Sequence, residues 1–104
     1  MTEKEIIERT QAKIIVNATT EIEGFYVGDF MSRVVSKAPA KSLWLTVMTN
    51  VNVAGVASLA EISAVLLCEG VTPDELLISK CKNEGIGLFS TDLNVFDASV
   101  RLAK

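Results

Sequence analysis

The chain has 104 residues, which is the length of one typical domain. Hydrophobic residues make up 49% of it and charged residues 22%, so the composition supports a folded core and excludes a disordered chain. The net charge of −3 argues against a protein that binds nucleic-acid phosphates, and the absence of histidine removes the commonest general base and metal ligand.

The first part of the chain is predicted to contain two helices and two strands. They are a helix at residues 2–10, strands at residues 13–16 and 23–27, and a helix at residues 29–37. Thr2 and Glu5 have the spacing of a capping box, in which each side chain accepts a hydrogen bond from the backbone of the other. β-branched residues fill the first strand, and Pro39 ends the second helix because proline cannot continue the hydrogen-bond ladder.

In the second part of the chain, predicted strands and helices alternate regularly. Apolar runs predict strands at residues 43–48, 64–68 and 86–89, and helices are predicted at residues 51–62, at residues 72–84 and near the end of the chain. Thr72 is expected to cap the second of these helices, since Pro73 and Glu75 follow it at the positions typical of a helix start. Thr91 or Asp92 is expected to cap the last helix. The predicted apolar face of that helix consists of Val95, Phe96, Val100 and Ala103.

Apolar strands that alternate with helices are typical of a parallel sheet, because helices then cover both of its faces. We therefore predict a single α/β domain over residues 1–104. It is expected to have three layers and a mainly parallel sheet of about five strands. The pattern does not indicate the order of the strands in the sheet.

The loops that follow the predicted strands are the candidate ligand site, because open parallel sheets bind ligands beyond the carboxyl ends of their strands. The candidate ligand-binding residues in these loops are Thr49, Asn50, Asn52, Gly70, Ser90 and Thr91. Capping of the following helices is the competing interpretation for each of them. Since no Lys or Arg lies between Lys41 and Lys80, a phosphate group here would depend on backbone amides, and we do not expect a nucleotide phosphate site.

The segment at residues 53–60 is apolar nearly all around the predicted helix. One apolar stripe is enough to cover a sheet, so a second stripe requires a second partner. That partner is either another helix of the same chain or a second copy, and a twofold homodimer is the commonest assembly. The expected dimer interface consists of Val53, Val56, Ala57 and Ala60.

No pattern of residues indicates catalysis, a cofactor or a metal. Cys68 and Cys81 form no CxxC pair and are expected to be reduced core residues. The glycines match neither GxGxxG nor GxxxxGK[ST], so no nucleotide-binding loop is predicted. The charged N-terminus is unlike a signal peptide and no apolar run is long enough to span a membrane, so we expect a cytoplasmic protein that binds neither membranes nor nucleic acid.

Four segments resemble the DRTGG domain family: residues 24–32, 43–59, 69–75 and 84–91. Their order and spacing extend the resemblance over nearly the whole chain. That domain is an α/β module similar to the amino-terminal domain of HPr kinase/phosphatase, and it occurs in phosphotransacetylases and in CBS-domain pyrophosphatases. The resemblance implies an accessory role in regulation and dimerisation, with the chemistry located elsewhere. The namesake Asp-Arg-Thr-Gly-Gly is absent, with residues 21–25 in its region, and Glu69-Gly70 replaces the usual Gly-Gly.

Three functional hypotheses follow. The leading one is a non-catalytic regulatory module that forms a homodimer and binds a partner protein or a small ligand. The alternative is a small-molecule sensor for a metabolite or nucleotide, in which the dimer is incidental. The third, an enzyme of phosphoryl transfer, is disfavoured because the chain has no histidine, no P-loop and no cationic cluster.

Overall fold

The computed structural model describes residues 1–104, in which five helices and five strands follow one another along the chain. The strands are β1 (Lys13–Val16), β2 (Gly24–Val27), β3 (Ser42–Thr46), β4 (Ala64–Leu67) and β5 (Gly87–Ser90). The helices are α1 (Glu3–Thr10), α2 (Met31–Lys37), α3 (Asn52–Leu59), α4 (Glu75–Glu84) and α5 (Val95–Ala103). Every helix and strand predicted from the sequence is present, with bounds that differ by a few residues.

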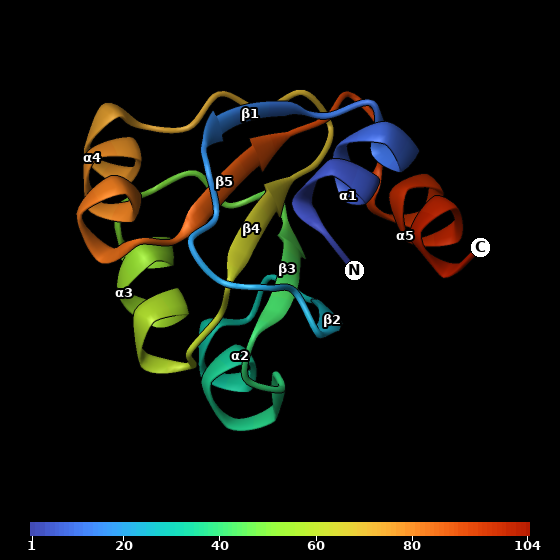
Figure 1. Cartoon of the computed structure of the whole chain (residues 1–104). Coiled ribbons are helices and arrows are strands. Elements are labelled where there is room, and N and C mark those ends of the chain that lie inside the picture. The colour runs from blue at the N-terminus through green and yellow to red at the C-terminus, as the bar shows by residue number, and fades with distance from the viewer.

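The five strands form one sheet in the order β1-β5-β4-β3-β2 (Figure 1). Each strand from β2 to β5 runs parallel to its neighbour, whereas β1 pairs with β5 in the antiparallel direction. The prediction of a mainly parallel five-stranded sheet is therefore confirmed. The register sets both Lys13 and Leu67 opposite Ser90, so the start of β1 and the ends of β4 and β5 meet at one edge.

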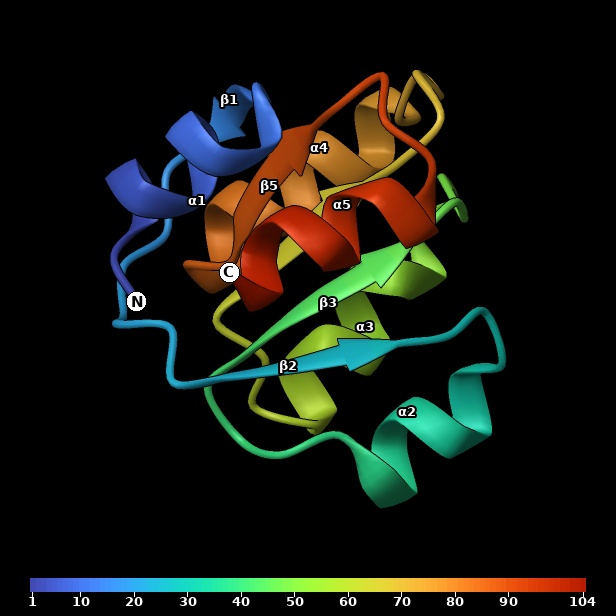
Figure 2. The same cartoon turned by 90° about the vertical axis from the view of Figure 1, so that its right-hand side faces the viewer.

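The layers follow from the order of the strands. From β2 to β5 each new strand is added on the same side of the last, and crossovers of one hand then place every connecting helix on one face. Accordingly α2, α3 and α4 cover one face of the sheet, while α1 and α5 cover the other (Figures 1 and 2). One face thus has three covering helices and the other has two.

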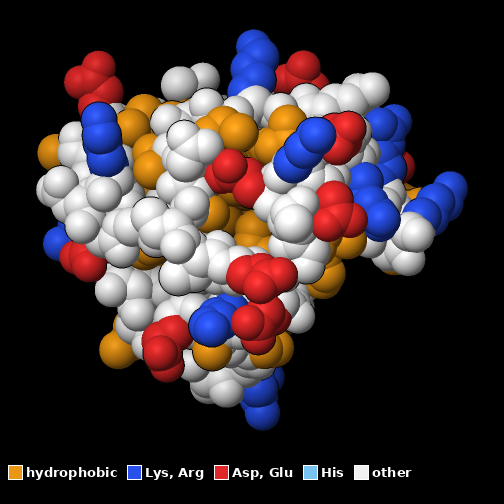
Figure 3. All heavy atoms as spheres, in the orientation of Figure 1, with side chains coloured by type: hydrophobic (Ala, Val, Ile, Leu, Met, Phe, Trp, Pro, Cys, Tyr) orange, Lys and Arg blue, Asp and Glu red, His pale blue; other side chains and the backbone are white.

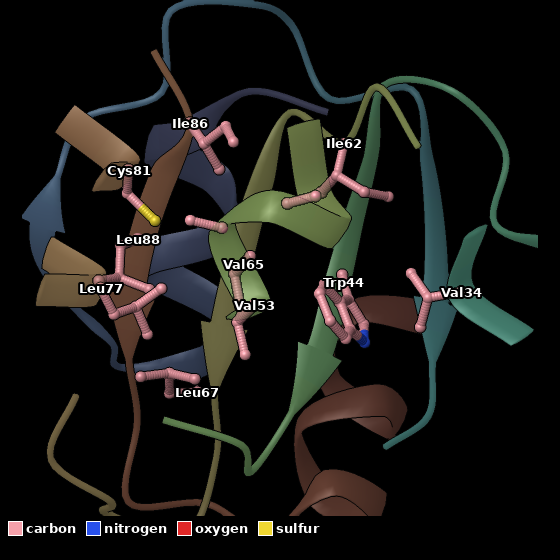
Figure 4. Packing of buried hydrophobic residues seen from close by; sticks show 12 residues of the cluster. Val34, Trp44, Val53, Ile62, Val65, Leu67, Leu77, Cys81, Ile86 and Leu88 are labelled. Atoms are coloured by element: carbon pink, nitrogen blue, oxygen red, sulfur yellow. The ribbon is translucent and has the colours of Figure 1, made fainter. Parts of the chain in front are cut away.

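Each face of the sheet has its own apolar core. On the side of α2, α3 and α4, Trp44 of β3 lies among buried residues that include Val53 and Leu77 (Figure 4). On the side of α1 and α5, Phe89 packs with Ile6 and other buried residues. Because both faces are covered, β3 and β4 are buried along their whole length, which explains their continuous apolar sequences.

Asp29 does not begin a helix as predicted; α2 starts two residues later. One carboxylate oxygen of Asp29 accepts hydrogen bonds from the Thr46 hydroxyl at 2.5 Å and from the Val47 amide at 3.1 Å. The Trp44 indole N–H donates to the Gly28 carbonyl at 2.8 Å. These bonds attach the loop after β2 to β3.

The helix starts agree with the sequence in one case and differ in another. The capping box of α1 is confirmed, since the Glu5 amide donates to the Thr2 hydroxyl and the Thr2 amide donates to the Glu5 carboxylate. The prediction for α4 is wrong because Asp74, and not Thr72, is the N-cap residue. The Asp74 side chain makes no capping hydrogen bond. Its backbone amide donates to the Thr49 carbonyl at 3.0 Å, and this bond joins the loops that precede α3 and α4.

The start of α5 also differs from the prediction. Asn94 is the N-cap, and its side-chain oxygen accepts a hydrogen bond from the Asp97 amide at 2.8 Å. Neither Thr91 nor Asp92 caps this helix. The loop between β5 and α5 is therefore longer than the sequence pattern indicates.

The apolar face of α5 is the largest difference from the sequence prediction. Ala98 and Leu102 are the buried residues of this helix. Phe96 is 74% exposed and Val100 is 37% exposed, although both belong to the apolar face that the sequence predicts for this helix. The helix thus has a second apolar stripe, Phe96 and Val100, which this chain covers only in part.

Candidate functional site

A groove of about 300 Å³ opens at the edge where β4 and β5 end and β1 begins. Polar residues dominate its lining: Gln11, Lys13, Ile15, Gly70, Val71, Thr72, Pro73, Ser90 and Asp92. The position agrees with the rule that ligands bind beyond the carboxyl ends of parallel strands.

Gly70 brings two loops of this groove together. Glu69 and Gly70 both have left-handed backbones, with φ of 66° and 67°. The Glu69 amide donates to the Leu93 carbonyl at 2.8 Å, and the Gly70 amide donates to the Thr91 carbonyl at 3.0 Å. A Cβ on Gly70 would lie 3.0 Å from a carboxylate oxygen of Asp92, so a side chain here would crowd the two loops.

The structure places two of the six candidate ligand residues, Gly70 and Ser90, in this groove. Thr91 is buried, and its hydroxyl donates to the Thr10 carbonyl at 2.7 Å and accepts from the Leu93 amide at 3.2 Å. Thr91 is thus a structural residue of the loop.

The other three candidates do not line the groove: Thr49 and Asn50 belong to the loop before α3, and Asn52 is the first residue of α3. The Asn50 side-chain oxygen accepts a hydrogen bond from the Asn52 amide at 2.9 Å, in a turn that leads into α3. Asn50 is nevertheless not the N-cap, because that position is occupied by Val51. Thr49 supplies its carbonyl to α4, as described above.

The sequence reasoning missed Gln11 and Lys13. They enter the groove because β1 pairs with β5, and a strand order is not visible in a local pattern. Lys13 supplies a positive charge to the groove, whereas the chain has no Lys or Arg between Lys41 and Lys80. The groove therefore has one positive group, Lys13, and one negative group, Asp92, and neither forms an ion pair within the chain.

The expected dimer interface on α3 is only partly at the surface. Val53 and Ala57 are fully buried in the core between α3 and the sheet (Figure 4 labels Val53). These two residues have no surface to offer to a partner. Val56 and Ala60 are half-buried and pack against the same core.

The two cysteines are buried and unpaired, one in each core. Burial raises the pKa of the Cys81 thiol from 9.0 to about 11. Burial, together with the nearby carboxylates of Glu69 and Asp29, raises the pKa of the Cys68 thiol to about 11 as well. The reactive thiolate form is therefore disfavoured at both positions.

We expect neither thiol to react with Ellman's reagent at pH 8 in the folded chain, whereas both should react at once in denaturant. Because each thiol holds its proton more tightly in the folded chain, this contribution to stability is complete below pH 9 and is lost as the pH rises toward 11. Urea titrations across this pH range measure the loss. Rapid labelling of the native protein would contradict the burial of the two side chains.

Metal ligands, helix hydropathy and surface charge bear on three other classes of site. No group of three or more His, Cys, Asp or Glu side chains is placed to hold a metal ion. None of the five helices has the length and hydropathy that a bilayer crossing requires. Acidic and basic side chains are intermixed over the face in Figure 3, which has no basic stripe of the kind that nucleic-acid binding uses.

A solved structure with a similar fold contains the CBS and DRTGG domains of the regulatory region of Clostridium perfringens pyrophosphatase, complexed with its activator, diadenosine tetraphosphate. The two structures match with a TM-score of 0.80 and 15% sequence identity, over 97% of this chain and 45% of that one. The match supports a DRTGG-like α/β fold. This chain spans less than half of the length of that regulatory region. No protein-family model and no curated protein matches the chain.

Proposed function

We propose that this chain is a non-catalytic regulatory module that forms a homodimer and binds a small polar ligand in the groove at the carboxyl ends of β4 and β5. The observation that carries the proposal is the groove itself, which gathers residues from three separate segments at one edge of a DRTGG-like fold. The similar pyrophosphatase region is regulatory and binds a nucleotide activator, which favours a regulatory role here.

The lining of the groove indicates the chemistry of the ligand. The Lys13 ammonium can attract an anionic group, while Asp92 and the hydroxyls of Thr72 and Ser90 can bind donors of the same molecule. A small molecule with both an anionic group and hydrogen-bond donors fits these partners. Binding rather than turnover is favoured because the chain has no histidine and both thiols are held protonated.

Thermal unfolding with a panel of ligands tests this proposal. The panel contains mononucleotides, diadenosine tetraphosphate, amino acids and small organic acids. A ligand at one hundred times its dissociation constant should stabilise the chain by roughly 2.7 kcal/mol, which for a domain of this size raises the melting temperature by about 10–20 °C.

A matched pair of variants places the ligand in the groove. Thr72→Tyr fills the groove from an exposed position and should abolish the thermal shift, whereas Ser79→Tyr, on the exposed side of α4, should preserve it. A shift that survives Thr72→Tyr would put the ligand elsewhere. The absence of a shift with every ligand of the panel would contradict the ligand-binding part of the proposal.

A further inference from the structure

An apolar cleft of about 200 Å³ lies between α5 and β2. It is on the face of the sheet that α1 and α5 cover, and Figure 2 shows this face. Its lining includes Phe25 and Val27 of β2, Leu45 of β3, and Ser99 and Ala103 of α5. No charged residue lines the cleft. The cleft is on a different part of the molecule from the polar groove described above, and the two have no lining residue in common.

The floor of the cleft, which we call the β2 floor, consists of Phe25 and Val27. Side chains alternate along a strand, and Tyr26 packs against the core on the side of α2, α3 and α4. Phe25 and Val27 therefore point to the opposite face, where they are 42% and 49% exposed. In Figure 2, α5 lies over the middle of the sheet and leaves β2 uncovered.

The wall of the cleft continues into an apolar ridge on α5, which we call the α5 ridge and which consists of Phe96 and Val100. Residues three and four apart share one side of a helix, so Phe96 and Val100 adjoin Ser99 and Ala103 in the wall of the cleft. The ridge projects into solvent, with Phe96 74% exposed. Scattered apolar residues are ordinary at a protein surface, but a stripe beside an apolar cleft is typical of an interface.

We propose that the α5 ridge of a second copy of this chain occupies the β2 floor, and that the first copy's ridge occupies the floor of the second. This inference rests on the homodimer of the proposed function and names its interface. A projecting ridge and an empty floor lie side by side on one face of the same chain. A twofold axis between them brings each ridge onto the other copy's floor, which makes the surface self-complementary.

The size and the charge of this surface fit a dimer contact. A phenylalanine buries about 150–250 Å², so the exposed parts of Phe25 and Phe96 together offer roughly 200 Å² of apolar surface. A standard interface buries about 800 Å² on each partner, and these two side chains would supply about a quarter of it. The absence of charge in the cleft means that no buried ion has to be paired.

Sedimentation at micromolar concentration tests the interface with two matched variants. The wild type should have twice the 11.2 kDa mass of one chain. Phe96→Glu places a charge in the interface and should weaken the dimer by about a hundredfold or more. Leu76→Glu makes a similar change at a residue that is 69% exposed on α4, on the other face of the sheet, and should leave the dimer intact.

A wild-type monomer would overturn both the homodimer of the proposed function and this interface. A wild-type dimer that persists in Phe96→Glu would overturn the interface alone, and Val56→Asp would then test the remaining surface of α3. Circular dichroism establishes that each variant is folded.

If Phe96→Glu does not fold, Ala103→Cys decides the question. Ala103 lies between the ridge and the floor and is therefore close to the proposed axis, so the two introduced thiols should form an intermolecular disulfide on oxidation. Leu76→Cys should form none, and the native thiols are buried and do not interfere. Failure of Ala103→Cys to cross-link in a dimeric protein would overturn the interface.

Discussion

Leu77→Ala should destabilise the chain by about 2–5 kcal/mol, a large part of the stability of a domain of this size. Leu77 is fully buried on the sheet-facing side of α4, in the core that also contains Trp44 and Leu88 (Figure 4). Truncation removes three carbon atoms of the side chain from that core and leaves a cavity, because α4 cannot easily move in to fill it. Hydrogen bonds to other segments hold the helix at its start, from the Asp74 amide to the Thr49 carbonyl, and just past its end, from the Thr19 hydroxyl to the Gly85 carbonyl. Urea unfolding followed by the fluorescence of Trp44, the single tryptophan of the chain, measures the loss.

The neighbouring residue provides the control. Leu76 is 69% exposed, so Leu76→Ala makes the same chemical change one position earlier in the same helix and should alter the stability by less than about 0.5 kcal/mol. Similar losses in the two variants would mean that α4 presents a different face to the sheet from the one described here. Such a result would also remove Leu76 as a control for the dimer interface.

The sequence predicts the local structure of this protein well, since each element is marked by a pattern within its own residues. The capping box at Thr2 and Glu5 defines the start of α1, and Gly85 ends α4 with a left-handed backbone, at φ of 72°, where the sequence predicted the end. The starts of α4 and α5 were misplaced because several residues in each loop can act as a cap. Tertiary hydrogen bonds, such as that from the Asp74 amide to the Thr49 carbonyl, decide which of them does so.

The candidate site was predicted only in part, because it depends on the order of the strands. The rule that ligands bind at the carboxyl ends of strands correctly selects the loops of Gly70 and Ser90. It cannot select Lys13, which begins a strand and reaches the same edge only because β1 runs antiparallel to β5. Local sequence patterns therefore cannot predict that Lys13 supplies the positive charge of the groove.

The exposed apolar stripe on α5 could not be predicted from the sequence either, because a local pattern does not show which segments pack against a helix. An apolar stripe of helical period predicts a buried face, but the pattern does not say whether the chain itself or a partner buries it. The sequence argument assigned the partner-facing surface to α3, where the chain in fact buries Val53 and Ala57 against its own sheet. The sequence pattern places Phe96 and Val100 on the apolar face of the last helix, whereas the buried residues of that helix are Ala98 and Leu102.

Two glycine-to-alanine substitutions should change the stability in opposite directions. Gly87 begins β5 next to Ala64 of β4, and a Cβ at Gly87 would lie 2.9 Å from the Cβ atoms of both Ala64 and Ala18. Ala64 belongs to β4, and Ala18 belongs to the connection between β1 and β2. A Cβ atom cannot move away from Gly87 unless the backbone of its own segment shifts. Gly87→Ala should therefore cost about 1–3 kcal/mol.

Gly55 has no atom within 4 Å of the place that its Cβ would take, and it lies in the interior of α3. Glycine weakens a helix interior relative to alanine, so Gly55→Ala should stabilise the chain by about 0.5–1 kcal/mol. Urea midpoints of both variants measure the two effects. In the Gly87→Ala background, Ala64→Gly should cost less than it does alone, because it relieves one of the two close contacts. Midpoints that shift in the same direction, or losses that simply add, would contradict the packing described for the start of β5.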